Sequence, residues 1–323
     1  MGIAMQKLIC LILRRTIAFI LFSISFSAIA ATGNTVTITH TQGHTTIPAH
    51  PQRVIIFDPV VLDIADALGI GVIGVPQNDA PYPDYLAKYK NRRYSNVGTL
   101  FEPDYEALNQ LKPDLIIAGG RVFDAYDKLS LIAPVIALDL DTHHLSDSLK
   151  QRTMLLADLF GKRQHAEKLL ADFNSHLENF RKKNVTGESA MVLLISGGKI
   201  SEYSPGSRFG FVFDLLGFKP ALNHEPLSGN HGNVVTSELI MSANPDWLFI
   251  IDRDGAIGNN HNLSAKQVLD NPLIRRTTAW RRQHIIYLDS RALYIAGGIQ
   301  AYLRALMQID QAVTVDDNES AAK

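Results

Sequence analysis

Two stretches of the chain decide the fold: EALNQLKPDLIIAGGR at residues 106–121 and ELIMSANPDWLFIIDR at residues 238–253. In each, a helical pattern ends at a Pro-Asp pair and an apolar run follows. An arginine comes after the run, Arg121 in the first stretch and Arg253 in the second. A short apolar run bounded in this way is typical of a strand buried on both faces of a parallel sheet. The match predicts a duplicated Rossmann-like lobe, with chance as the alternative because Pro-Asp before a buried strand is common.

Strands and helices alternate on both sides of these stretches. Apolar runs such as RVIIF (53–57) and AMVLLI (190–195) predict further buried strands, and TVTITHTQGHTTIP (35–48) predicts a hairpin at the start. Alternating strands and helices predict an α/β fold with mostly parallel sheets. We therefore expect an N-terminal lobe over residues 31–144 and a C-terminal lobe over residues 185–315.

The segment between the two lobes has a different pattern. Apolar residues recur at helical spacing over residues 145–184, and Gly161 is the one interruption. This length predicts a long backbone helix that joins the lobes. The last residues, DDNESAAK (316–323), are charged or small, which predicts a disordered tail.

The first thirty residues are typical of a secretory signal peptide. Lys7, Arg14 and Arg15 precede or flank an apolar core, and Ala-Ile-Ala at 28–30 forms a cleavage site. An uncleaved anchor is the alternative. The single cysteine, Cys10, lies in this segment, so we expect a mature protein with no disulfide, no thiol nucleophile and no thiolate metal site. Because no cysteine stands at the cleavage site, we expect a soluble periplasmic protein without a lipid anchor.

The charge of the chain argues against nucleic acid as a partner. The formal net charge is -1 at pH 7, with 31 Lys and Arg against 32 Asp and Glu. Loss of the cationic signal peptide makes the mature chain more acidic, and no basic run is long enough to follow a phosphate backbone.

Three arginines are candidate ligand-binding residues. Arg121 and Arg253 follow predicted strands, and ligands of open parallel sheets bind beyond the carboxyl ends of the strands. Arg208 lies in SEYSPGSRFGFVFDLLGF (201–218), and aligning the Leu-Gly pairs that end two helices places it opposite Val60, on the cleft side. A surface ion pair is the alternative for any one of them. Three guanidinium groups that converge suit a ligand with about three negative charges on oxygen.

His231 and Tyr294 are candidate ligands of ferric iron. His231 lies between glycines in LSGNHGNVVTSE (227–238), and Tyr294 lies in YLDSRALYIAGG (287–298). Imidazole nitrogen and phenolate oxygen are suitable donors to this metal. Hydrogen bonding within a loop is the alternative for each residue.

Four segments resemble a known family: GSRFG (206–210), GNHGNVVTSE (229–238), IIDRD (250–254) and YLDSRALYIAGG (287–298). Through them the chain is similar to the class III periplasmic substrate-binding proteins of iron-siderophore ABC transporters. Within that class it most resembles the binding proteins for ferric catecholate (enterochelin-type) siderophores. The resemblance implies a monomeric, non-catalytic carrier with a cleft between two lobes. It would deliver a ferric catecholate siderophore to an ABC permease in the inner membrane. Iron would arrive only as the siderophore complex, so no permanent cofactor is expected.

The resemblance also implies roles for individual residues. It assigns contacts with catecholate oxygens to the arginine triad, and completion of the iron shell to His231 and Tyr294. It further implies that one surface glutamate in each lobe faces permease arginines, and we assign these to Glu102 and Glu238. The alternative is that these two side chains only favour a helix N-terminus.

Other functions compete with this interpretation. Haem or a hydroxamate siderophore would use the same fold, although a hydroxamate complex carries little charge for the arginines to bind. An enzyme with His231 as base is disfavoured because neither GxSxG nor HExxH occurs in the sequence. A zinc carrier is disfavoured because its candidate ligands form no clustered run; they are His40, His44, His50, His143 and His144.

Overall fold

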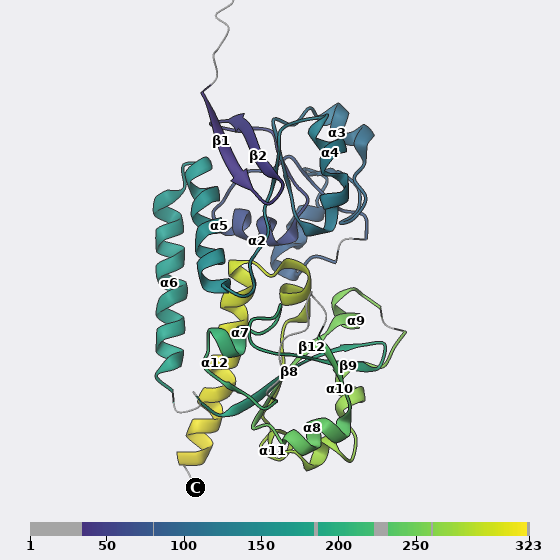
Figure 1. Ribbon diagram of the computed structural model, residues 1–323, viewed down its shortest axis with the longest axis vertical. Coiled ribbons are helices and arrows are strands. Elements are labelled where there is room, and N and C mark those ends of the chain that lie inside the picture. Colours follow the sequence, from purple (N-terminus) through teal and green to yellow (C-terminus); the bar gives the residue numbers. More distant parts are fainter. Residues whose placement is uncertain (1–33, 80, 184–186, 223–231, 260, 322–323) are drawn as a thin grey trace, which may run out of the picture. The chain divides into compact units, whose positions relative to one another are not determined.

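The chain from Thr35 onward forms one unit through its contacts, and this unit holds two separate open sheets with helices around them (Figure 1). The α/β class and the presence of two sheets confirm the sequence prediction. No helix in the described part of the chain is both long and apolar enough to cross a bilayer. The computed structural model describes residues 34–79, 81–183, 187–222, 232–259 and 261–321, so the expected signal peptide lies outside it.

The first sheet is five-stranded and parallel throughout, in the order β5-β4-β3-β6-β7. The Pro-Asp pair of the first repeat ties the start of β6 to the start of the central strand β3. The Asp114 carboxylate, just before β6, accepts hydrogen bonds from the backbone N of Gln52 and Arg53, just before β3, both at 2.8 Å. The antiparallel hairpin of β1 (Thr35–His40) and β2 (Gly43–Pro48) forms a sheet of its own. The other elements of this half are β3 (Val54–Ile56), α2 (Pro59–Ala67), β4 (Gly74–Val75), η1 (Asp84–Lys90), β5 (Ser95–Asn96), α3 (Tyr105–Leu111), β6 (Leu115–Ala118), η2 (Gly120–Ala125), α4 (Tyr126–Ser130) and β7 (Val135–Ala137).

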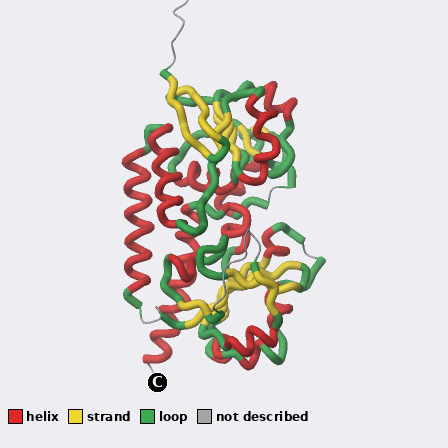
Figure 2. The backbone as a smooth tube through the Cα atoms, in the orientation of Figure 1, coloured by secondary structure: helices red, strands yellow, loops and turns green. Residues whose placement is uncertain are grey.

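The second sheet is mixed, in the order β11-β9-β8-β12-β13, with β10 beside β8. Its strands are drawn in yellow in the lower part of Figure 2, with helices around them. Its central strands are parallel, and Asp246 repeats the role of Asp114 by accepting from the backbone N of Ser189 at 3.0 Å. Strand β9 returns antiparallel to β8 through a Gly197-Gly198 turn, in which both glycines have positive φ. The elements are β8 (Ser189–Ser196), β9 (Lys199–Tyr203), α7 (Phe211–Asp214), β10 (Lys219–Pro220), β11 (Asn233–Val235), α8 (Ser237–Ala243), β12 (Trp247–Asp252), α9 (Arg253–Ala256), α10 (Ala265–Leu269), η3 (Ile274–Arg276), α11 (Thr278–Arg281), β13 (Ile285–Tyr287) and η4 (Ala292–Ala296).

Two helices, and not one, occupy the segment between the sheets. Helices α5 (Leu145–Leu159) and α6 (Arg163–Arg181) pack against each other. The chain turns at Gly161, whose φ of +63° is unfavourable for residues with a side chain. The interruption at Gly161 was predicted, but the reversal of the chain was not. Helix α12 (Ile299–Ala321) extends into the segment expected to be a disordered tail.

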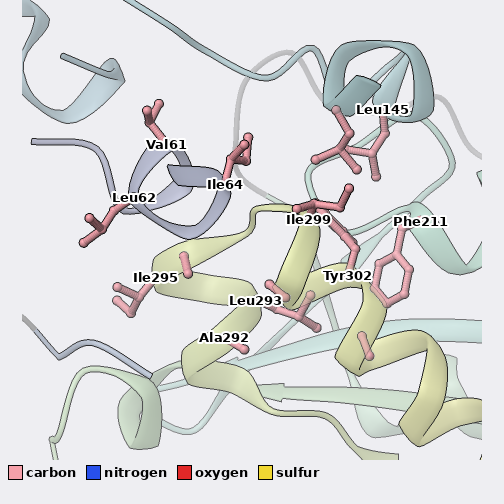
Figure 3. Packing of buried hydrophobic residues seen from close by; sticks show 14 of the residues in the cluster. Val61, Leu62, Ile64, Leu145, Phe211, Ala292, Leu293, Ile295, Ile299 and Tyr302 are labelled. Atoms are coloured by element: carbon pink, nitrogen blue, oxygen red, sulfur yellow. The ribbon is translucent and has the colours of Figure 1, made fainter. Parts of the chain in front are cut away.

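The two halves share one hydrophobic cluster. Each sheet buries alternate residues of its strands on opposite faces: Ile56 and Val192 face the shared cluster, whereas Ile55 and Leu193 belong to separate clusters on the far faces. Burying one such aliphatic side chain contributes about 1.5–3 kcal/mol. Packing within this shared cluster therefore holds the two halves together next to the candidate site. Figure 3 labels members from α2, α5, α7, η4 and α12: Val61, Leu62, Ile64, Leu145, Phe211, Ala292, Leu293, Ile295, Ile299 and Tyr302.

Candidate ligand-binding site

Three neighbouring strands of the first sheet end in charged side chains at one edge. Asp58 follows β3, Arg121 follows β6 and Asp139 follows β7, and these strands are adjacent in the sheet. The carboxyl edge of a parallel sheet is where such folds bind ligands. The first half thus presents an Asp-Arg-Asp row to the space beyond its sheet.

Asp58 and Gly119 fit together closely within this row. The Asp58 carboxylate caps helix α2 by accepting from the backbone N of Val60 at 2.6 Å. A Cβ atom at Gly119 would lie 1.6 Å from Asp58 Oδ2, so only glycine fits there. This close approach brings the turn that carries Arg121 against the start of α2.

Arg208 comes from the turn between β9 and α7. Gly206 has a positive φ, and its backbone N donates to the Asp214 carboxylate on α7 at 2.9 Å. Phe209 is buried, and the guanidinium of Arg208 lies 4.9 Å from its ring centroid. Arg208 thus follows an antiparallel strand that the sequence analysis did not identify.

All three arginines converge on Tyr294. Arg121 Nη2 donates to the Tyr294 carbonyl at 3.3 Å and Arg208 Nη2 donates to the same oxygen at 2.7 Å. Arg253 Nε donates to the Tyr294 hydroxyl at 2.8 Å, and its Nη1 donates to Ser196 Oγ at 3.2 Å. One tyrosine therefore connects guanidinium groups from three separate segments.

The ring of Tyr294 also lies against two of the guanidinium groups. The Cζ atoms of Arg208 and Arg253 are 4.7 and 5.6 Å from its centroid, within the range of cation–π attraction. Tyr294 lies on η4, a single π-helical turn, which ends at Gly297 with a φ of +62°. Such turns interrupt the regular hydrogen bonding of a helix and are frequent at functional sites. Burial, and then the nearby Arg121, lower the pKa of Arg208 below its usual value.

A pocket of about 400 Å³ opens beside this cluster. That volume is within the range of small-molecule sites. Among the described residues, Arg253 does not line the pocket, but it contacts Tyr294, which does. The polar and aromatic residues of the wall include Asp58, Arg121, Asp139, Arg208, Tyr294 and Tyr302.

Asp58 and Asp139 were missed by the sequence analysis. Burial raises the pKa of Asp58, and the neighbouring Arg121 opposes the shift. Partial desolvation, and then the Asp58 charge, raise the pKa of Asp139 to about 6. Both residues directly follow apolar runs, RVIIF and VIAL. The strand-end rule that identified Arg121 would therefore have identified them as well.

Of the two predicted docking residues, only Glu238 opens a helix, so the expectation of equivalent helix positions is wrong for Glu102. Glu238 is the second residue of α8, as expected, but Glu102 lies in the turn before α3, where Thr99 N donates to its carbonyl at 3.0 Å. The second residue of α3 is Glu106. The same number of positions separates Arg121 from Arg253 and Glu106 from Glu238. Both helices also end in a left-handed residue before Pro-Asp, so Glu106 is the structural counterpart of Glu238.

The remaining candidates are histidines, and the structure describes only some of them. His231 lies outside the described residues. His40 and His44 form hydrogen bonds with threonines of the N-terminal hairpin, at 2.8 Å to Thr45 Oγ1 and 3.0 Å to Thr39 Oγ1. Within the part of the chain that the structure describes, no group of three or more His, Cys, Asp or Glu side chains is arranged to hold a metal ion.

Comparison with known proteins identifies the class. The periplasmic binding protein family matches residues 54–292, and the chain belongs to this family. The petrobactin-binding protein YclQ of Bacillus subtilis is 36% identical over 79% of this chain and 80% of its own length. The ferric-anguibactin-binding protein FatB of Vibrio anguillarum is 35% identical over 80% and 81% of the two chains. The crystal structure of the periplasmic catecholate-siderophore binding protein VctP from Vibrio cholerae has a TM-score of 0.78 and 33% identity, covering 87% of this chain and all of that one.

Proposed function

We propose that the protein is a non-catalytic carrier that captures a ferric catecholate siderophore and delivers it to an ABC permease of the inner membrane. The convergence of Arg121, Arg208 and Arg253 on Tyr294 beside the pocket carries this proposal. Binding proteins for siderophores among the similar chains support the ligand class. We include export with removal of residues 1–30, a periplasmic location and a monomeric state in the proposal.

The hydrogen bonding of the arginines favours an anionic ligand. Arg121 and Arg208 donate to one neutral carbonyl oxygen. Each guanidinium has five N–H donors and a permanent positive charge, which a single carbonyl cannot match. Catecholate oxygens carry negative charge and accept in the geometry that guanidinium prefers. A hydroxamate complex, with little net charge, would leave these groups unpaired in a partly desolvated site.

Tyr294 is proposed as a donor to iron when the siderophore leaves coordination positions open. Its hydroxyl oxygen accepts from Arg253 Nε, so the arginine holds the phenol in a fixed orientation. A bis-catecholate fills four of about six ferric positions, and a phenolate oxygen is a suitable fifth donor. We propose that His231 supplies the sixth.

Docking to the permease is proposed through one exposed glutamate in each half. Glu106 and Glu238 occupy equivalent helix positions, and Glu102 lies four residues before Glu106. Both carboxylates of the equivalent pair are exposed, as contact with cationic residues of a partner requires. The pair Glu106 and Glu238 therefore replaces the pair first inferred from the sequence.

Binding measurements on the intact mature protein test the proposed ligand class. Titration with ferric tris-catecholate, ferric hydroxamate and haem, followed by fluorescence quenching and visible absorbance, should give tight binding only for the catecholate, with its broad charge-transfer band. A sharp Soret band with haem, or tighter binding of the hydroxamate, would refute the proposal. Chemically unaltered siderophore should be recovered, because the carrier performs no reaction.

A further inference from the structure

The wall of the pocket carries carboxylates beside the arginines, which a purely anionic ligand would not need. Asp58 and Asp139 flank Arg121 along the edge of the first sheet, and all three line the same pocket. Catecholate oxygens close to either carboxylate would be repelled. A cationic group of the ligand would match this side of the pocket better than a catecholate oxygen.

Only one of the two carboxylates is available to a ligand. Asp58 is 6% exposed, and its oxygens are used to cap helix α2 and to pack against Gly119. Asp139 is exposed, and its carboxylate lies over Gly120, with an oxygen 3.5 Å from where a Cβ of that glycine would stand. The Arg152 guanidinium donates through Nε to the Asp139 carbonyl oxygen at 2.9 Å and not to the carboxylate. The carboxylate accepts from the Gly120 backbone N and keeps further acceptor positions for a ligand.

We propose that Asp139 binds a protonated amine of the siderophore, so that the pocket selects ferric catecholates whose backbone carries an aliphatic ammonium group. The inference rests on the proposed function and specifies its substrate class. In this arrangement the arginines bind the catecholate oxygens, and the Asp139 carboxylate, which follows β7, binds the ammonium group. A ligand that carries both anionic catecholates and an ammonium group would bind in one orientation. The reversed orientation would place the ammonium group beside the arginines and the catecholates beside Asp139.

Partial desolvation of Asp139, and then the charges around it, set the pH range of this contact. Its charged neighbours are Asp58 from the β3 end, Arg121 from η2 and Arg152 from α5, and Arg208 lines the same pocket. With its pKa raised to about 6, Asp139 is ionised at neutral pH and loses its charge as the pH falls through 6. An aliphatic amine stays protonated throughout, since its pKa is near 10. The ammonium contact should therefore weaken on acidification.

A matched pair of ligands tests the proposal. One is the ferric complex of a synthetic bis-catechol amide whose linker holds one secondary amine, and the other is the same compound with that amine acetylated. For the wild-type protein, the amine complex should bind more tightly. In Asp139→Asn, affinity for the amine complex should fall about fivefold, as expected for a partly solvated ion pair, and affinity for the acetylated complex should stay the same or rise.

Controls separate this contact from general electrostatics. Asp141→Asn removes an exposed carboxylate of the same segment that instead binds His144, and it should leave both affinities unchanged. For the wild-type protein, the ratio of the two dissociation constants should move towards one between pH 7.5 and 5, and this ratio cancels protonation of the catecholates. Equal changes for both ligands in Asp139→Asn, or a pH-independent ratio, would show that Asp139 only balances Arg121 and Arg152. Absence of binding for both ligands to the wild type would refute the proposed function itself.

Discussion

Replacing Arg208 by methionine separates its contribution to ligand binding from its contribution to the fold. Methionine keeps an unbranched apolar stem against the rings of Phe209 and Tyr294, over which the guanidinium now lies at 4.9 and 4.7 Å. The positive charge and the 2.7 Å hydrogen bond to the Tyr294 carbonyl are lost. Burial and Arg121 already disfavour the charged form of Arg208, which is why its pKa is lowered.

The two effects of this substitution differ in size. Removing one member of a desolvated charged contact costs about 2–5 kcal/mol of binding free energy. Arg208 is half-buried, so the lower end applies. About 2 kcal/mol corresponds to a roughly 30-fold rise in Kd. For the free energy of unfolding, loss of about 1 kcal/mol from the hydrogen bond and about 0.5–1 kcal/mol from the ring contacts is offset by removal of the desolvated charge. We expect a net change within about 1 kcal/mol.

Fluorescence titration with ferric tris-catecholate and urea unfolding of the unliganded protein measure the two quantities. Arg275→Met is the matched control, because Arg275 is exposed and pairs with Asp270 at 2.7 Å, away from the pocket. The control should change neither quantity appreciably. If Arg208→Met binds the catecholate as the wild type does, or if binding falls only in proportion to a large loss of stability, the arginine cluster is not the ligand site.

Three further predictions concern Tyr294, the docking glutamates and a buried carboxyl. Tyr294→Phe removes the hydroxyl oxygen to which Arg253 donates. The affinity for tetradentate catecholate complexes should fall by about tenfold or more, with a shifted visible band, and the affinity for hexadentate complexes should fall much less. Equal losses of affinity with unchanged spectra would contradict iron ligation by Tyr294. Glu106→Ala with Glu238→Ala should abolish uptake of the ferric complex by cells at unchanged Kd, whereas adding Glu102→Ala to Glu238→Ala should have no further effect; the reverse ranking would restore the first assignment. Burial raises the pKa of Asp63 to about 7 from 3.8, so the folded state keeps a proton that the unfolded state loses, and stability should fall as the pH rises from about 4 to about 7. In Asp63→Asn, urea unfolding across that range should lose this pH dependence, and an unchanged slope would assign it to other groups.

Much of the site could be predicted from the sequence because one topological rule governs it. Arg121 and Arg253 lie where the rule for parallel strand ends places them, and the two halves repeat the same helix, Pro-Asp turn and strand. The same rule applies to Asp58 and Asp139, which directly follow the runs RVIIF and VIAL. Their positions were therefore predictable from the sequence, although an anionic ligand alone gives no reason to expect carboxylates there.

Other features depend on contacts that local patterns do not encode. The reversal at Gly161 requires α5 and α6 to pack against each other, and a single periodic stretch gives the same signal for one helix or two. Strand β9 is a short segment of mixed polarity, and it is a strand because it pairs with β8 on one side and β11 on the other. The use of the Tyr294 carbonyl as an acceptor is a property of its π-helical turn, which has no sequence signature.

The shared cluster limits how the chain can be divided into fragments. The turn that carries Tyr294 and the start of α12 come last in the sequence, yet the Asp63 carboxylate of α2 accepts hydrogen bonds from the backbone N of Gln300 at 2.8 Å and Ala301 at 3.1 Å. The first half therefore depends on the final helix to satisfy a buried acid and to cover its apolar face. A fragment cut between the sheets would leave both pieces with unburied apolar surface, so a split or permuted version should place its new ends in an exposed loop and keep α2 and α12 in one polypeptide or in a tightly reassembled pair. The two halves, although similar in pattern, therefore fold as a single unit.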